Sequence, residues 1–189
     1  MKWSPLRQAL SSPSQYAGDV TSAESWVVRA ATTADIRPIA ALIQPLVDSR
    51  VLLGKDLVVL FESVQEFTVA VDSQAQVVGC GALHAFWEDL GEIRTLSVDP
   101  RVQGQGVGHQ LLEELERQAT QLGLTRLFCL TFEVEFFTSH GFVSHDDLLV
   151  DPEVYAEMVR SPDEGLAEFL DLARVKPNTL GNSRMVKNL

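Results

Sequence analysis

The stretch Ser97-Val98-Asp99-Pro100-Arg101-Val102-Gln103-Gly104-Gln105-Gly106-Val107-Gly108 gives the strongest indication of fold in this 189-residue chain. It follows a strand-like run and opens a helical pattern, with apolar residues spaced from Leu111 to Ala119 and a stop at Gly123. Glycines in such a turn let main-chain N–H groups face inward, and the next helix adds its own N–H groups and positive dipole end. The turn is therefore suited to hold the phosphates of an anionic ligand.

Other structures contain comparable turns. A tight loop that merely reverses the chain direction remains an alternative. A dinucleotide site would need a third glycine where His109 stands, and a P-loop would need Gly-Lys-Ser/Thr, which does not occur here.

Hydrophobic periodicity on both sides of the turn predicts a mixed α/β (α+β) fold. Residues 67–71, 77–87 and 91–98 predict three successive antiparallel strands, and the apolar run 126–131 predicts a central strand. Further strands are expected at 26–30, after Phe142 and at 182–186, and helical segments from Thr32 or Thr33, over 55–65, near 136–137 and after Asp151. Residues 1–25 predict a disordered leader, and residues 26–189 a single domain.

Charge and composition narrow the class of partner. The formal net charge of −11 argues against nucleic acid and against an anionic membrane surface as partners, and no apolar run predicts a membrane span. Cys80 and Cys129 lie in apolar runs and predict free thiols, while the four histidines show no metal spacing. Residues 1–25 lack the apolar core of a secretory signal, so a cytoplasmic enzyme is expected. The histidine and cysteine spacing leads us to expect no metal. A homo-oligomer remains possible.

The turn resembles the acyl-CoA-binding motif of the GNAT acetyltransferase superfamily through Arg101, Gly104 and Gly106. The resemblance implies the GNAT fold, a central, mostly antiparallel sheet flanked by helices, and acetyl-CoA as co-substrate. By the same resemblance, the main chain near Leu96 and Val98 would hold the pantetheine arm. The main-chain amides expected to hold the pyrophosphate are those of Gln103, Gly104, Gln105, Gly106, Val107 and Gly108.

A narrower resemblance, from about Val27 to Phe142, is to the acetyltransferase domain of N-acetylglutamate synthases in their short, stand-alone form. It is carried by the runs Val51-Leu52-Leu53-Gly54-Lys55, Gln65-Glu66-Phe67-Thr68-Val69, Gly79-Cys80-Gly81-Ala82-Leu83-His84, Gly91-Glu92-Ile93-Arg94-Thr95 and Arg126-Leu127-Phe128-Cys129-Leu130-Thr131. The family's reaction would transfer the acetyl group of acetyl-CoA to the α-amino group of L-glutamate, the first step of arginine biosynthesis.

The resemblance also suggests catalytic residues. Glu92 matches the glutamate that serves these synthases as general base, acting through a water, and Thr131 matches the hydroxyl proposed to protonate the leaving thiolate. The alternatives are an edge-strand glutamate that faces solvent or pairs with Arg94, and a threonine that simply ends a strand.

Substrate carboxylates require local cations in this acidic protein. Lys55 and Ser183 match substrate-binding positions of the synthases, and Arg94, Thr95 and Arg184 complete the expected set. The synthases carry an arginine close before the matching serine, where Gly181 and Asn182 stand here. This departure leaves the second carboxylate without an obvious partner and extends the expected substrates to L-glutamine.

Two other functions remain possible. The fold also suits an acetyltransferase for another amine, such as a peptide N-terminus or an aminoglycoside, and the acidic composition would favour a cationic substrate. A non-catalytic acyl-CoA sensor would keep the glycine turn without turnover.

Overall fold

The computed structural model describes residues 26–145, 150–163, 166–167, 170 and 181–189, so the expected leader over residues 1–25 lies outside the described part. Seven strands form one sheet in the order β1-β2-β3-β4-β5-β7-β6. Only β4 and β5 pair in parallel; the other neighbours are antiparallel. The strands are β1 (Val27–Ala30), β2 (Phe67–Val71), β3 (Val77–Ala85), β4 (Leu90–Val98), β5 (Arg126–Thr131), β6 (Val143–Ser144) and β7 (Ser183–Asn188). The predicted mixed fold with a mostly antiparallel sheet is confirmed.

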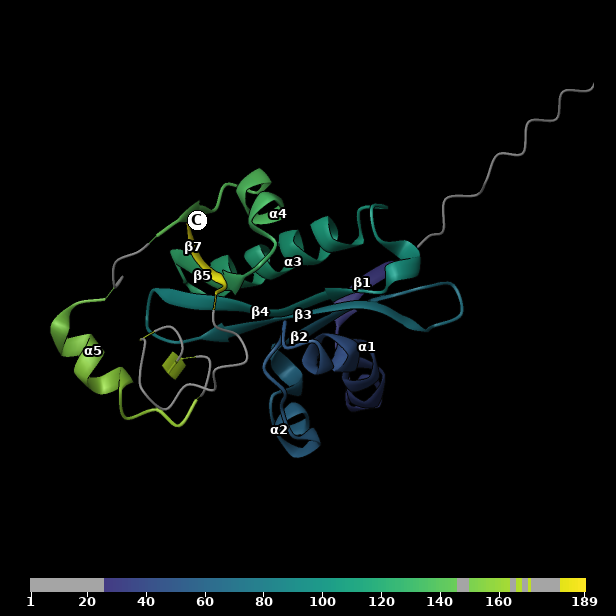
Figure 1. Cartoon of the computed structure of the whole chain (residues 1–189), viewed down its shortest axis with the longest axis horizontal. Helices are drawn as coiled ribbons and strands as arrows, with labels where there is room; N and C mark the ends of the chain where they lie inside the picture. The colour runs from purple at the N-terminus through teal and green to yellow at the C-terminus, as the bar shows by residue number, and fades with distance from the viewer. Residues whose placement is uncertain (1–25, 146–149, 164–165, 168–169, 171–180) are drawn as a thin grey trace, which may run out of the picture.

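Helices cover both faces of this sheet. In Figure 1, α1 and α2 lie below the sheet and α3 and α4 above it, while α5 lies at the far end from the N-terminal strand. Their bounds are α1 (Ile36–Asp48), α2 (Leu57–Glu62), α3 (Val107–Leu122), α4 (Val134–Ser139) and α5 (Pro152–Met158), with 3-10 turns η1 (Thr33–Asp35), η2 (Val64–Glu66) and η3 (Pro100–Val102). No helix within the described ranges is long and apolar enough to cross a membrane.

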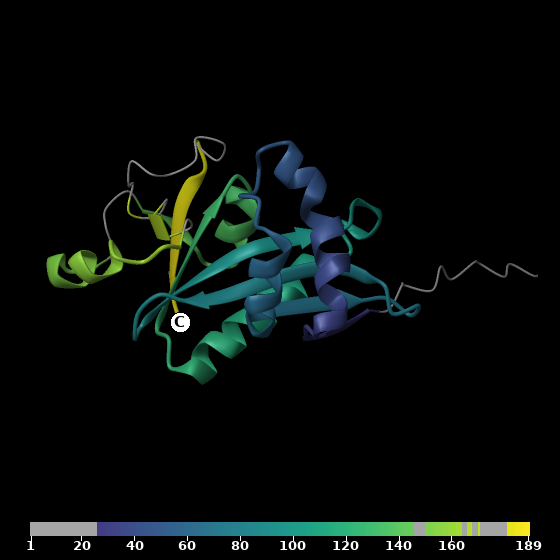
Figure 2. The same cartoon turned by 90° about the horizontal axis from the view of Figure 1, so that it is seen from below.

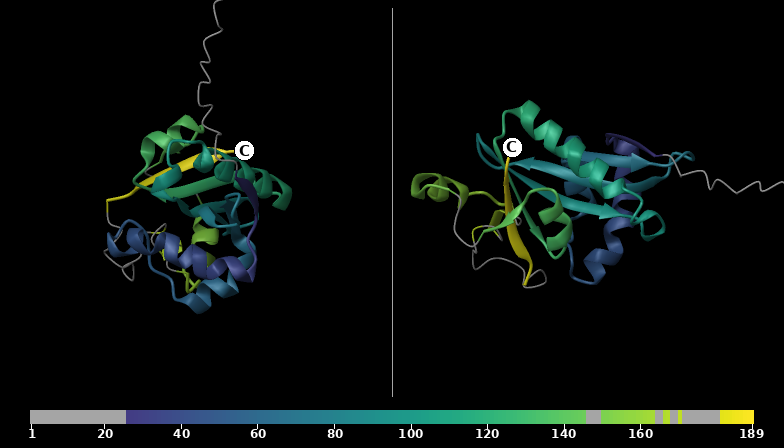
Figure 3. Two further views of the ribbon diagram at one scale, coloured as in Figure 1. Left: turned by 90° about the vertical axis from the view of Figure 1, so that its right-hand side faces the viewer. Right: turned by 90° about the horizontal axis from the view of Figure 1, so that it is seen from above.

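The helix α3 lies close against β3 because two glycines leave room for it. A Cβ atom at Gly79 would lie 2.9 Å from side-chain atoms of Leu111 and Val107, and one at Gly81 would lie 2.8 Å from Leu115. These α3 leucines are fully buried, and Figure 3 (right) shows the helix running across the sheet. The close packing holds the N-terminus of α3 beside the end of β4, where the glycine turn joins them.

The sheet splits between β4 and β5. Their parallel pairing covers three residue pairs, from Leu90 with Arg126 to Glu92 with Phe128. No further pairs follow Glu92 and Phe128, and the two strands diverge from there on, as the fan of strands in Figure 2 illustrates. In the same half of β4, the pairing with β3 shifts register, and Thr95 adopts a left-handed conformation with φ of 57°. A bulge of this kind bends a strand and re-aims its groups, so the main chain of β4 becomes accessible from the split.

Candidate active site

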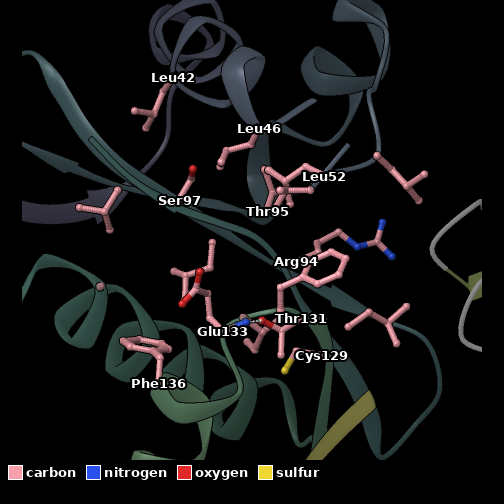
Figure 4. Close-up of a pocket in the computed structure, with 18 of the residues that line it drawn as sticks. Leu42, Leu46, Leu52, Arg94, Thr95, Ser97, Cys129, Thr131, Glu133 and Phe136 are labelled. Carbon is pink, nitrogen blue, oxygen red and sulfur yellow. Dashed lines mark hydrogen bonds between the residues drawn. The ribbon is translucent and has the colours of Figure 1, made fainter. Parts of the chain in front are cut away.

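The split opens into a cleft of about 1000 Å³. That volume lies at the upper end of ligand pockets and suits a large ligand together with a small one. The walls come from α1, the segment before α2, β4, the glycine turn, β5 and α4. Figure 4 shows Leu46 of α1 on one side and Thr131 of β5 on the other, with Thr95 of β4 between them.

The glycine turn forms one end of the cleft. Gly104 and Gly106 have φ of 75° and 93°, a region that L side chains rarely adopt, and Gly106 is the N-cap of α3. The first N–H groups of α3 therefore lack intrahelical partners at the cleft wall. Five of the six residues expected to cradle a pyrophosphate line the cleft, namely Gln103, Gly104, Gly106, Val107 and Gly108. Gln105 is outside the cleft lining, and its side chain turns back to the carbonyl of Arg101, 3.3 Å away.

The strand β4 forms the floor. Thr95, Leu96 and Val98 all line the cleft. The carbonyl of Val98 accepts a hydrogen bond of 3.2 Å from Nε2 of the Gln103 side chain. A ligand that uses this carbonyl must share or replace that bond.

Glu92 is buried at the base of the split, 5% exposed, on a central strand rather than an edge strand. Its Oε2 accepts a hydrogen bond of 2.6 Å from Nε of Arg94, whose side chain is 9% exposed. Burial raises the pKa of Glu92, and the positive charge of Arg94 only partly opposes this effect. The pairing with Arg94 considered from the sequence is therefore present, but it lies inside the cleft, where burial raises the pKa of the carboxyl.

A second carboxylate binds the same arginine. Asp163 accepts from Arg94 at 3.0 Å (Nη1 to Oδ2) and 3.2 Å (Nη2 to Oδ1). Burial tends to raise the pKa of Asp163, but the charge and hydrogen bonds of Arg94 outweigh it and lower the value to about 2. Lys55 also lines the cleft and acts electrostatically on both Glu92 and Asp163. Among the described residues Lys55 forms no ion pair of its own.

Thr131 and Cys129 line the cleft from β5. The Oγ1 of Thr131 accepts a hydrogen bond of 2.9 Å from the N–H of Glu133, so its own proton remains available for donation. Burial, followed by the negative charge of Glu92, raises the pKa of the Cys129 thiol. A thiol held protonated is a poor nucleophile, so an acyl-cysteine intermediate at Cys129 is disfavoured.

Two expected substrate residues lie outside the cleft lining. Ser183 and Arg184 begin β7, where they pair with Thr131 and Leu130 of β5, and the neighbouring Asn182 lines the cleft instead. The candidates Lys55, Arg94 and Thr95 line the cleft together with Glu92 and Thr131. Ser183 lies beside Thr131 in the sheet without lining the cleft.

The sequence interpretation missed Asp163 and the apolar wall from α1. Asp163 follows Ser161-Pro162, and its Oδ1 accepts from the N–H of Leu166 at 2.8 Å, a pattern typical of a helix N-cap. That local signal gives no hint of a contact with Arg94, 69 residues away. Leu42 and Leu46 are half-buried residues of α1, and the sequence pattern did not indicate that they border a ligand cleft.

Within the described part of the chain, no group of three or more His, Cys, Asp or Glu side chains could hold a metal ion. His109 lines the cleft at the glycine turn, and its Nδ1 lies 2.6 Å from Nε2 of His140. Burial, with His109 adding to it, lowers the pKa of His140. Both imidazoles pack against Phe136.

Comparison with known proteins relates this cleft to one enzyme family. The profile of the acetyltransferase (GNAT) family matches residues 45–142. An amino-acid acetyltransferase of Mycobacterium tuberculosis is 53% identical over 162 residues, covering 85% of this chain and 92% of that protein. A crystal structure of an M. tuberculosis protein in complex with CoA and the ligand NLQ has a TM-score of 0.83 at 53% identity, covering 86% of this chain and 99% of that one.

A longer enzyme shares the same domain. The N-acetylglutamate synthase of Neisseria gonorrhoeae, complexed with coenzyme A and N-acetyl-glutamate, has a TM-score of 0.69 at 28% identity. The match covers 87% of this chain but 35% of that protein. The family profile matches about half of this chain, and the M. tuberculosis enzyme is covered almost completely. The cleft at the split sheet is consistent with the same family. The chain belongs to the acetyltransferase (GNAT) family and, within it, to the amino-acid acetyltransferases.

Proposed function

We propose that this enzyme transfers the acetyl group of acetyl-CoA to the α-amino group of L-glutamate, and also of L-glutamine, as the first step of arginine biosynthesis. The observation that carries the proposal is the burial of Glu92 in a cleft that the glycine turn and the cation Lys55 also line. The complexes of the related enzymes with CoA and, in the N. gonorrhoeae synthase, with N-acetyl-glutamate support the choice of donor and acceptor.

The glycine turn and β4 bind the donor in this proposal. The amides around Gly104 and Gly106 meet the pyrophosphate, which gains from the dipole of the 16-residue helix α3. The main chain at Leu96 and Val98 holds the pantetheine arm, so the thioester lies near Glu92 and Thr131 on either side of the split.

Acetyl transfer then proceeds by direct attack of the amine. Glu92, through a bound water, takes a proton from the substrate ammonium, and its raised pKa brings it nearer to the working pH of a general base. The amine nitrogen forms a bond to the acetyl carbon, and the carbon–sulfur bond breaks. The hydroxyl of Thr131 gives a proton to the departing thiolate and regains one from the nitrogen, which loses its second proton as it becomes the amide. The raised pKa of Cys129 supports direct transfer over a covalent acyl-enzyme.

The acceptor lies between β4 and α2. Lys55 binds the α-carboxylate, because charge-assisted hydrogen bonds are the strong ones for an anion, and Arg94 and Thr95 complete this end of the cleft. Two buried free thiols, Cys80 and Cys129, support placing the reaction in the cytoplasm.

A thiol-release assay tests the proposal. Purified protein is incubated with acetyl-CoA and each of the common amino acids, together with a peptide amine and an aminoglycoside, while free CoA is measured. Turnover with L-glutamate or L-glutamine, and none with the cationic amines, is expected. Turnover confined to the peptide or aminoglycoside would contradict the proposal, and acetyl-CoA binding without any turnover would favour a sensor.

A further inference from the structure

The guanidinium of Arg94 is occupied along two edges. Its Nε meets Glu92 at 2.6 Å, and its two terminal nitrogens meet the oxygens of Asp163 at 3.0 Å and 3.2 Å. An arginine has five N–H donors in a planar fork. In this arrangement the edge that would bind a ligand carboxylate bidentately is already filled by Asp163.

Asp163 is fixed in place by its own surroundings. Its Oδ1 caps the following turn through the N–H of Leu166 at 2.8 Å, and its N–H lies 3.2 Å from the Oγ of Ser161. Leu166 is 2% exposed and packs with Met158 and Phe128 in one buried cluster. These two hydrogen bonds position Asp163 in the lining of the cleft.

The lining of the cleft contains more carboxylates than cations. Among the described residues that line it, the permanent cations are Lys55 and Arg94. The carboxylates are Asp56, Glu92, Glu133 and Asp163. A zwitterionic amino acid with a neutral side chain adds no net charge, whereas a side-chain carboxylate adds one more negative charge. Burial of a charge without a counter-ion is costly.

We infer that Asp163 is a specificity-determining residue, which neutralises Arg94 and thereby selects acceptor amino acids with a carboxamide over those with a side-chain carboxylate. This inference rests on the proposed function. Without the negative charge of Asp163, Arg94 would become available to a side-chain carboxylate, and the repulsion between the two carboxylates would disappear. Specificity of this kind arises from repulsion of the wrong ligand as much as from attraction of the right one.

The variant Asp163→Asn tests this role, because asparagine keeps an oxygen for the N-cap and removes the charge. The quantity to measure is kcat/KM for L-glutamine divided by kcat/KM for L-glutamate, at saturating acetyl-CoA and neutral pH. The ratio in the wild type is expected to exceed one. It should fall about tenfold in the variant, which is the size of effect expected when one repulsive contact between two charges is removed. The change should come mainly from a lower KM for L-glutamate. Asp163→Ser, a second uncharged N-cap, should shift the ratio in the same direction.

Glu133→Gln is the matched control. It removes one negative charge from the same cleft lining, but that carboxylate does not bind Arg94. The ratio should therefore stay within about twofold of the wild type. An unchanged ratio in both Asp163 variants, with turnover intact, would overturn the inference and leave the proposed function standing. An equal loss for both amino acids would also overturn it. Absence of turnover with either amino acid in the wild type would remove the proposed function and this inference together.

Discussion

Two arginine–carboxylate clusters in this molecule use the same chemistry to different ends. Near the start of α1, Arg29 pairs with Asp35 through two hydrogen bonds of 2.8 Å and 2.9 Å, with the arginine 37% exposed. In the cleft, Arg94 joins Glu92 and Asp163 and is 9% exposed. The hydrogen bonds of Arg29 lower the pKa of Asp35 to about 2, whereas burial raises the pKa of Glu92.

The difference shows what separates a structural ion pair from a reactive one. Asp35 also accepts from the N–H and the hydroxyl of Thr32, at 2.7 Å and 2.8 Å, so its hydrogen bonds outweigh the effect of burial and favour its charged form. Glu92 shares its arginine with a competing carboxylate in a buried site, so its charged form is less favoured. A carboxyl group of the second kind suits proton transfer.

The largest expected effect comes from Glu92→Gln. At neutral pH we expect kcat to fall by about 10²- to 10⁴-fold, the usual contribution of a general base. Part of the rate should return at high pH, because the free amine then accumulates without help. The protein should remain folded, since Arg94 keeps Asp163 as a partner. The measurement is kcat against pH for the variant and the wild type, and a loss of equal size at every pH would contradict the role as base.

Replacement of Lys55 should have a smaller effect than replacement of Glu92. In Lys55→Ala we expect the KM for the amino acid to rise about tenfold, as when one charge-assisted hydrogen bond is lost, with the KM for acetyl-CoA nearly unchanged. Arg37→Ala is the control, because Arg37 is an exposed arginine of α1 outside the cleft lining. The opposite pattern, a raised KM for acetyl-CoA alone, would move Lys55 to the donor site.

A change in the pair of Arg29 and Asp35 should lower the stability of the protein and leave kcat/KM unchanged. For Asp35→Asn we expect the free energy of unfolding at neutral pH to fall by about 1–2 kcal/mol, through the lost charge and hydrogen bonds to Arg29 and Thr32. Because the pKa of Asp35 in the folded protein is about 2, below its ordinary 3.8, this stabilisation is present above about pH 4 and is lost as pH falls toward 2. Denaturant unfolding of both proteins at pH 7, 4 and 2 measures it. A difference that persists undiminished at pH 2 would be inconsistent with a charged Asp35.

Much of this architecture could be predicted from local sequence patterns. The glycine turn, the apolar period of α3 and the meander from β2 to β4 depend on neighbours in the chain, and the structure confirms them. Lys55, Glu92 and Thr131 could be placed in one site through a family resemblance, and all three line the cleft.

The remaining features depend on contacts between distant segments. Asp163 reaches Arg94 across 69 residues, and its local sequence indicates only a helix cap. Asn182 lines the cleft, and Ser183 and Arg184 pair with β5; the local sequence does not indicate this long-range pairing. The burial of Glu92 follows from the parallel pairing of β4 with β5, which the pattern of either strand alone does not indicate.

The comparison of the two clusters is tested most directly by an NMR titration of the carboxyl carbons of Glu92 and Asp35, assigned with the spectra of Glu92→Gln and Asp35→Asn. We predict that Asp35 titrates near pH 2 and that Glu92 titrates above the ordinary 4.5 of a glutamate. A Glu92 that titrates below that value would show that Arg94 outweighs burial, and would contradict its role as the base of the acetyl transfer.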